Sequence, residues 1–195
     1  MADRYHYGKR IAQDYLQAIN WYKEAAEYGH AKAQKTLAYM YYYGTGVVQD
    51  YKQSVYWGEK AAEQGNAEAQ NLLGCMYEDG SNSIVQDYKQ ALYWFKKAAE
   101  QGEKYAQSNL AEMYAEGKGV VQDYKQALYW GEKAAEQGNA EAQNLLGYMY
   151  AEGNGVVQDD KQAIYWLKKA AEQGLEIAKN RLDTMLSKLD DDKKC

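Results

Sequence analysis

The sequence predicts an all-α protein built as a one-dimensional array of antiparallel helix pairs. A period of 36–37 residues runs along the chain, and each period contains two amphipathic segments with helical spacing. The tryptophans show the period most clearly, at positions Trp21, Trp57, Trp94, Trp130 and Trp166. A single amphipathic helix cannot bury its apolar stripe alone, so neighbouring helices must stack. Stacking at a fixed period predicts a superhelix with a concave side.

One helix of each period, here called helix B, begins at Gln-Asp-Tyr-Lys-Gln and ends at Ala-Ala-Glu-Gln-Gly. In the unit around residue 90, Asp87 occupies the cap position and Gln90 follows three residues later, as in a capping box. Gly102 supplies the left-handed turn that ends the helix. The apolar stripe between these ends consists of Ala91, Leu92, Phe95, Ala98 and Ala99.

The other helix, helix A, follows directly and carries the pattern Ala-x-Ala-Gln-x-x-Leu. Gly80 stops the helix A of the second unit, and the segment 80–84 contains a one-residue insertion that indicates a loop. The apolar stripe of this helix consists of Ala69, Leu72, Leu73, Met76 and Tyr77. Tyrosines that recur with the period, such as Tyr77, are expected to be packing residues.

The domain organisation follows from this register. We expect one array over residues 1–188, followed by a polar tail over 189–195. The array comprises about ten helices: a lone helix B at about 14–28, repeats at about 30–65, 66–102, 103–138 and 139–174, and a closing helix A at about 175–188.

A longer period of two units is also visible, because residues 49–77 and 122–150 match at 26 of 29 positions. The residue after each tryptophan alternates between large and small, with glycine at Gly58 and Gly131. Both a duplicated two-unit block and close packing at these glycines explain the alternation.

The composition excludes several classes of function. A net charge of -5 argues against a nucleic-acid-binding protein, which needs a basic face. No apolar run approaches the roughly 20 residues needed to span a bilayer. The first residues lack the apolar core of a signal peptide, so we expect a cytoplasmic location, or a periplasmic or secreted one if a signal peptide was removed.

No motif for chemistry stands out. The two histidines, His6 and His30, lie in no metal-binding spacing, and His30 is expected to be a solvated first-turn residue. Neither a phosphate-binding loop nor a Gly-x-Ser-x-Gly elbow is present. The two cysteines, Cys75 and Cys195, do not make a disulfide framework. The sequence therefore predicts no enzyme, no metal and no cofactor.

The last complete period reads Gly153-Asn154-Gly155-Val156-Val157-Gln158-Asp159, then Ala163-Ile164-Tyr165-Trp166 and Lys169-Ala170-Ala171-Glu172-Gln173-Gly174. This pattern resembles the Sel1-like repeat, a relative of the tetratricopeptide repeat. The similarity covers roughly residues 5–186 and implies a right-handed α/α superhelical solenoid. Valine stands at 48, 85, 121 and 157, where the family often has proline, and the cysteine pairs of some secreted bacterial relatives are lacking.

The likeness to tetratricopeptide repeats implies that helix A lines the concave face. Face positions then recur along helix A at i, i+3, i+7 and i+10, and they vary in chemical type between units. Tyrosine is common among them, and it is enriched where proteins bind one another. The predicted partner-binding residues are Lys32, Lys35, Tyr39, Tyr42, Tyr43, Glu68, Asn71, Cys75, Glu78, Tyr105, Ser108, Glu112, Asn144 and Tyr148.

These observations predict a non-catalytic scaffold, expected to be a monomer, that binds a protein partner on its concave helix-A face. Two narrower roles come from the family resemblance. One is a bacterial immunity protein that neutralises a toxic effector. The other is a secreted or periplasmic factor that acts on a host or on the envelope.

Overall fold

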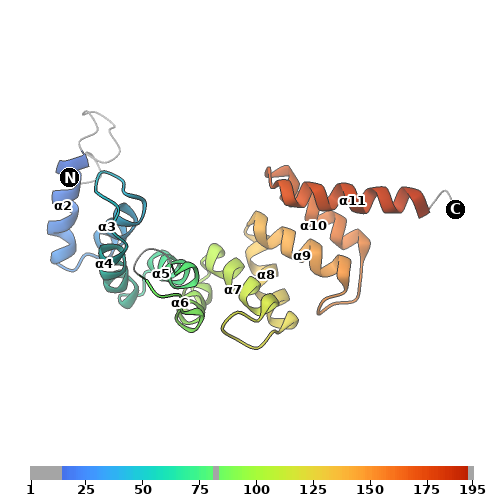
Figure 1. Cartoon of the computed structure of the whole chain (residues 1–195), viewed down its shortest axis with the longest axis horizontal. Helices are drawn as coiled ribbons and strands as arrows, with labels where there is room; N and C mark the ends of the chain where they lie inside the picture. Colours follow the sequence, from blue (N-terminus) through green and yellow to red (C-terminus); the bar gives the residue numbers. More distant parts are fainter. Residues whose placement is uncertain (1–14, 81–83, 193–195) are drawn as a thin grey trace. The chain divides into compact units, whose positions relative to one another are not determined.

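The computed structural model describes residues 15–80 and 84–192, and the structural statements below concern these residues. They form ten α-helices and no strand (Figure 1), which confirms the all-α prediction. Residue 14, where the first helix B was expected to begin, the loop residues 81–83 and Cys195 lie outside the described residues.

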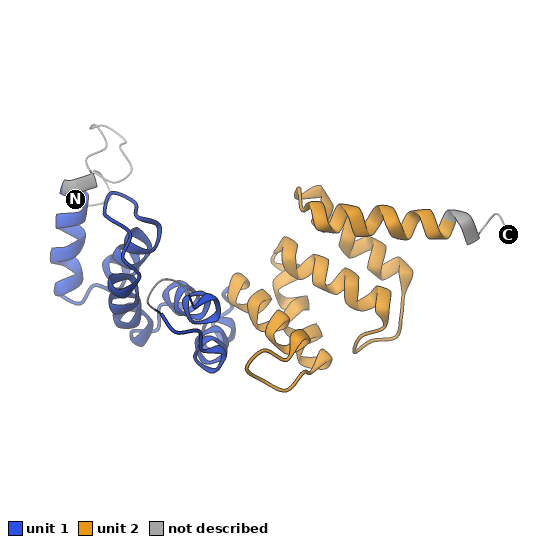
Figure 2. Cartoon of the chain, viewed as in Figure 1, with its two compact units in different colours: residues 1–103 blue, residues 104–195 orange. Residues whose placement is uncertain are grey.

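The chain forms two compact units, Met1–Glu103 (unit 1) and Lys104–Cys195 (unit 2), shown in Figure 2. Even-numbered helices are of type B and odd-numbered helices are of type A. Unit 1 contains α2 (Tyr15–Glu27), α3 (Ala31–Tyr43), α4 (Tyr51–Glu63), α5 (Ala67–Asp79) and α6 (Tyr88–Glu100). Unit 2 contains α7 (Lys104–Glu116), α8 (Tyr124–Glu136), α9 (Ala140–Glu152), α10 (Asp160–Glu172) and α11 (Glu176–Asp192).

The aspartate caps and the glycine stops are present as predicted, whereas α11 ends later than predicted. Asp87 caps α6, because its Oδ1 accepts hydrogen bonds from the backbone N–H of Lys89 (2.9 Å) and of Gln90 (3.1 Å). Gly153 ends α9 in the left-handed region with φ 72°, which glycine adopts without steric cost. By contrast, α11 extends to Asp192, so residues 189–192 are helical where a polar tail was predicted. No glycine or proline follows Lys188 to stop the helix.

Each helix A packs closely on the helix B that follows it, and side-chain sizes on the two helices complement each other. In the α5–α6 pair, a Cβ on Gly74 would lie 2.5 Å from the ring of Phe95. In the α9–α10 pair, a Cβ on Gly147 would lie 2.6 Å from Cγ of Leu167. The large helix-B side chain therefore needs a glycine opposite it on helix A.

In the α3–α4 and α7–α8 pairs both facing residues are small. There the glycine is on helix B, at Gly58 and Gly131, and it faces Ala38 or Ala111 of helix A. A Cβ on Gly58 would lie 3.2 Å from Cδ2 of Leu73, and a Cβ on Gly131 would lie 3.3 Å from Cδ2 of Leu146. In these four pairs the residue after the tryptophan is large where helix A has a glycine and is glycine where helix A has an alanine, so the alternation follows the size of the facing residue.

A buried glutamine on helix A joins each helix B to the next within a unit. In unit 1, Nε2 of Gln70 donates to the carbonyl oxygen of Ala62 (2.9 Å), and its Oε1 accepts from Nε2 of Gln101 (2.7 Å). In unit 2, Gln143 makes the same two bonds, to Ala135 (3.1 Å) and from Gln173 (2.8 Å). The glutamine of the helix-A motif is therefore a structural residue rather than a surface residue.

Candidate functional site

The predicted partner-binding residues all fall on the odd-numbered helices α3, α5, α7 and α9. Twelve of the fourteen are exposed or half-buried. Ser108 and Asn144 differ from the prediction, because they are buried, with exposed fractions of 2% and 8%. They were placed on an open face by their spacing along the helix. That spacing takes no account of neighbouring helices, which can cover a side chain.

In unit 1, side chains of α3 and α5 form what we call the tyrosine surface: Lys35, Tyr39 and Tyr43 of α3 with Glu68 of α5. Nζ of Lys35 lies 2.5 Å from Oε2 of Glu68, and the hydroxyl of Tyr39 donates to the backbone carbonyl of Glu68 (3.3 Å). These contacts hold the two A helices together. The same residues line a hollow of about 370 Å³, together with Thr36, Met40 and Thr45.

The tyrosine rings of α3 support one another. The rings of Tyr39 and Tyr43 are stacked, with centroids 6.2 Å apart, and Tyr42 meets Tyr43 edge-on at 4.8 Å and Tyr51 at 5.5 Å. Tyr43 remains 65% exposed. Burial, with a contribution from the Glu68 carboxylate, raises the pKa of the Tyr39 hydroxyl, which therefore stays protonated as a donor.

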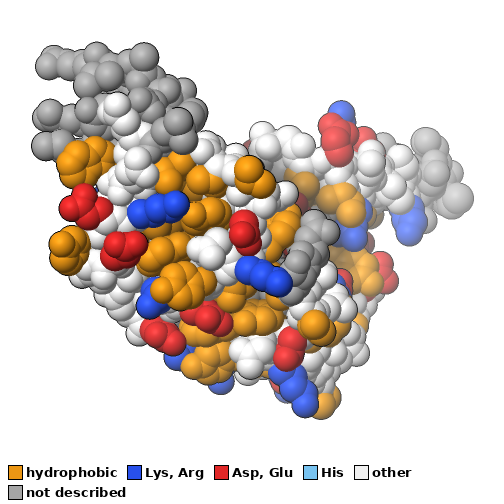
Figure 3. Space-filling view, turned by 60° about the vertical axis from the view of Figure 1, so that its left-hand side comes forward, with side chains coloured by type: hydrophobic (Ala, Val, Ile, Leu, Met, Phe, Trp, Pro, Cys, Tyr) orange, Lys and Arg blue, Asp and Glu red, His pale blue; other side chains and the backbone are white. Residues whose placement is uncertain are grey.

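Charges of both signs surround the apolar side chains of unit 1. Figure 3 shows orange hydrophobic groups interspersed with lysines and carboxylates on the face turned to the viewer. Among the other predicted residues of this unit, Lys32 is exposed, while Asn71, Cys75 and Glu78 are half-buried. Cys75 forms no disulfide.

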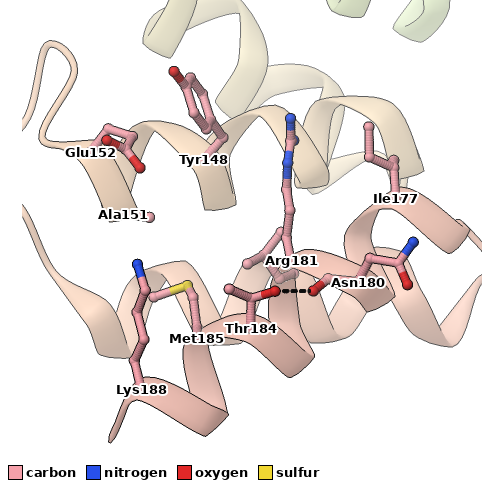
Figure 4. A pocket seen from close by; sticks show the side chains of 10 residues that line it. Tyr148, Ala151, Glu152, Ile177, Asn180, Arg181, Thr184, Met185 and Lys188 are labelled. Carbon is pink, nitrogen blue, oxygen red and sulfur yellow. Dashed lines mark hydrogen bonds between the residues drawn. The ribbon is translucent and has the colours of Figure 1, made fainter. Parts of the chain in front are cut away.

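In unit 2, a pocket of about 340 Å³ lies between α9 and α11, and we call it the α9–α11 pocket (Figure 4). Of the predicted residues, only Tyr148 lines it. Tyr105 and Glu112 of α7, which were also predicted, lie outside this pocket. The pocket is lined by Tyr148, Ala151 and Glu152 of α9, Leu167 of α10, and Ile177, Asn180, Arg181, Thr184, Met185 and Lys188 of α11.

Arg181 is the most distinctive residue of this pocket, and it was not predicted. Its Nη1 donates to Oδ1 of Asn144 at 2.8 Å, and its Cζ lies 5.1 Å from the centroid of the Tyr148 ring. The buried Asn144 thus orients the arginine. Continuing the face register into the closing helix gives Ile177, Asn180 and Thr184, which would have located the pocket from the sequence.

The described residues lack a metal-binding cluster and a membrane-spanning helix. No group of three or more His, Cys, Asp or Glu side chains among them is arranged to hold a metal ion. Within the same part of the chain, every helix is too short or too polar to cross a membrane.

Comparisons with known proteins agree on one family. The Sel1 repeat model matches residues 1–30, 31–66, 67–103, 104–139 and 140–175. No curated protein matches the chain significantly. Sel1 repeat proteins generally mediate protein–protein interaction, and the scaffold of this family is generally non-catalytic.

Solved structures give the same result. A protective antigen of uropathogenic Escherichia coli with an SLR fold is 42% identical, with a TM-score of 0.88; the alignment covers 94% of this chain and 39% of the antigen. A Sel1 repeat protein from Oxalobacter formigenes is 35% identical, with a TM-score of 0.84 over 94% of this chain and 75% of its own. Cysteine-rich protein B of Helicobacter pylori is 26% identical, with a TM-score of 0.54 over 71% of this chain and 99% of its own. The present chain thus spans well under half of the antigen's length, and it belongs to the Sel1 repeat family.

Proposed function

We propose that this protein is a non-catalytic scaffold that binds a protein partner through the exposed side chains of its A helices, chiefly the tyrosine surface. The observation that carries the proposal is the group of stacked tyrosine rings on α3 beside an open hollow. The periodic residues are committed to packing, whereas Tyr39 and Tyr43 depart from the period. Tyr43 is largely exposed, and both rings line the hollow beside them.

The physical properties of this surface suit protein recognition. Tyrosine contributes a large contact area with few rotatable bonds, so ordering it on binding costs little entropy. The stacking of Tyr39 on Tyr43 restricts both rings before a partner arrives. Lys35 and Glu68 contribute little affinity, because an exposed ion pair is weak, but they place a charge of each sign beside the hollow.

Tyr43 is the residue to test, because it is 65% exposed and its removal should leave the buried core intact. Tyr28, which is 79% exposed and lies outside the tyrosine surface, provides a matched control. The full chain, Tyr43→Ala and Tyr28→Ala would each serve as bait in quantitative affinity capture from the native cell.

We expect a specific partner to be depleted about tenfold or more with Tyr43→Ala and retained with Tyr28→Ala, since an interface hot spot contributes at least about 1.4 kcal/mol. Equal retention by all three baits contradicts the proposal, and so does equal loss with both variants.

The two narrower roles stay predictions with tests of their own. For an immunity protein, expression should rescue cells from a toxin encoded beside its gene. For a secreted or periplasmic factor, the full-length gene should encode a signal peptide that directs export.

A further inference from the structure

We infer that the α9–α11 pocket binds an acidic residue of an extended partner segment, with an aliphatic neighbour of that residue in the apolar part of the pocket. This inference rests on the proposed function, because it assigns partner chemistry to a second surface of the same scaffold. It depends on residues of unit 2 alone.

Arg181 provides the anchor for the carboxylate. A guanidinium has five N–H donors, and the only hydrogen bond of this group to the described residues is the one to Asn144. The ring of Tyr148 supports the cation at 5.1 Å and fixes its direction. The remaining donors are thus held in place before a ligand arrives, and a fixed guanidinium binds a carboxylate better than a mobile one.

The position of this arginine is specific to the last helix A. The corresponding residues of the preceding four A helices are Thr36, Leu72, Asn109 and Leu145, none of which is charged. The cation therefore does not follow from the repeat, and the packing of an A helix does not require it.

The rest of the pocket complements an acidic, partly apolar segment. Lys188 adds a second cation and Glu152 is the one carboxylate of the lining, so the local charge is opposite in sign to the net charge of -5 on the chain. Leu167, Ile177 and Met185 supply the apolar part, and the Ile177 side chain is 47% exposed. An aliphatic side chain next to the carboxylate would cover this apolar area.

An adjoining hollow of about 580 Å³ determines which way the partner segment runs across Arg181. It shares Tyr148, Ile177 and Arg181 with the pocket, but it is also lined by the carboxylates of Glu112, Glu116 and Glu141. These carboxylates repel an acidic residue, which is therefore confined to the α9–α11 side of Arg181. A polar or basic residue of the segment fits the hollow with the three glutamates.

The inference is tested with two libraries of acetylated, amidated heptapeptides over the immobilised full chain. The central residue is Asp in one library and Asn in the other, and the flanking positions are mixtures of Ala, Val, Leu, Ile and Ser. Blocked ends ensure that the side chain alone supplies the carboxylate. We expect the full chain to retain the Asp library about tenfold more than the Asn library.

Three variants test whether the preference for Asp over Asn arises in this pocket. Arg181→Gln should bring the ratio close to one, whereas Lys179→Gln, which removes an exposed cation of α11 outside the pocket, should keep it. If Arg181→Gln melts at a lower temperature than the native chain, Ile177→Asp serves instead. It adds a carboxylate to the lining and keeps Asn144 and Tyr148, which position Arg181, and it should also abolish the preference.

A ratio near one for the native chain overturns the inference, as does an Asp preference that survives Arg181→Gln or Ile177→Asp in a folded variant. Partner capture that still depends on Tyr43 would then show that only this inference has failed and that the proposed function stands.

Discussion

Replacing Gln143 by alanine is expected to weaken unit 2 by removing the link that joins α8 to the end of α10. The Gln143 side chain is buried, 3% exposed, and makes two hydrogen bonds, to the Ala135 carbonyl at 3.1 Å and from Gln173 at 2.8 Å. The Ala135 carbonyl keeps a bond from the N–H of Gly138 at 3.0 Å, so it is not left unpaired. The cost therefore comes mainly from the two lost bonds.

At about 0.5–1.5 kcal/mol for each net hydrogen bond, the free energy of unfolding should fall by about 1–3 kcal/mol. Gln173→Ala removes one of the two bonds but leaves the buried Oε1 of Gln143 without this donor, so its cost should be similar, about 1–3 kcal/mol. Gln162→Ala is the matched control, because its exposed side chain makes no hydrogen bond to the described residues; its effect should lie within about 0.5 kcal/mol of zero.

Denaturant unfolding of the full chain measures these differences, and hydrogen exchange locates them. Since each repeat contacts only its neighbours, amide protection should fall in α8, α9 and α10 and stay unchanged in α2–α4. A difference between Gln143→Ala and Gln162→Ala below about 0.5 kcal/mol would refute the structural role of the glutamine link.

Two further outcomes follow from the packing and the charges of unit 2. Gly147→Ala should lower the free energy of unfolding by about 1–3 kcal/mol more than Gly131→Ala. The new methyl group at position 147 would overlap Leu167, whereas at position 131 its nearest neighbour is the flexible end of the Leu146 side chain at 3.3 Å. Equal effects of the two substitutions in denaturant melts would contradict the size matching. Burial, with repulsion from Glu136, raises the pKa of the Glu132 carboxyl in the folded chain. The protonated carboxyl therefore favours the folded state; this contribution is complete below the pKa of the unfolded chain and is lost as the pH rises through the pKa of the folded chain. Glu132→Gln should therefore raise the melting temperature at about pH 7 and leave it unchanged at about pH 3, and thermal melts that shift equally at both pH values would exclude this cause.

Much of the fold could be predicted from the sequence, because the repeat displays its local signals several times. The cap at Asp87 and the stop at Gly153 each depend on a few neighbouring residues, and both are present in the structure. The end of α11 was misjudged, because a helix without a stop signal continues through polar residues.

The candidate site was predicted less completely, for reasons of packing. A helical register gives the direction of a side chain but not what covers it, so the burial of Asn144 and Ser108 was missed. Arg181 was missed because it occupies a position that is uncharged in the preceding A helices, and its importance depends on Asn144 and Tyr148 across the pocket. A contact between two helices cannot be seen in the pattern of either one.

Site-specific photo-crosslinking tests the central claim, that the tyrosine surface of α3 and α5 binds a protein partner, most directly. A photoreactive phenylalanine analogue would be placed at Tyr43, and at Tyr28 as the control, in the full chain in its native cell; both positions are well exposed. The account predicts a discrete protein adduct from position 43 that is absent from position 28. The same adducts from both positions, or none from position 43, would contradict it.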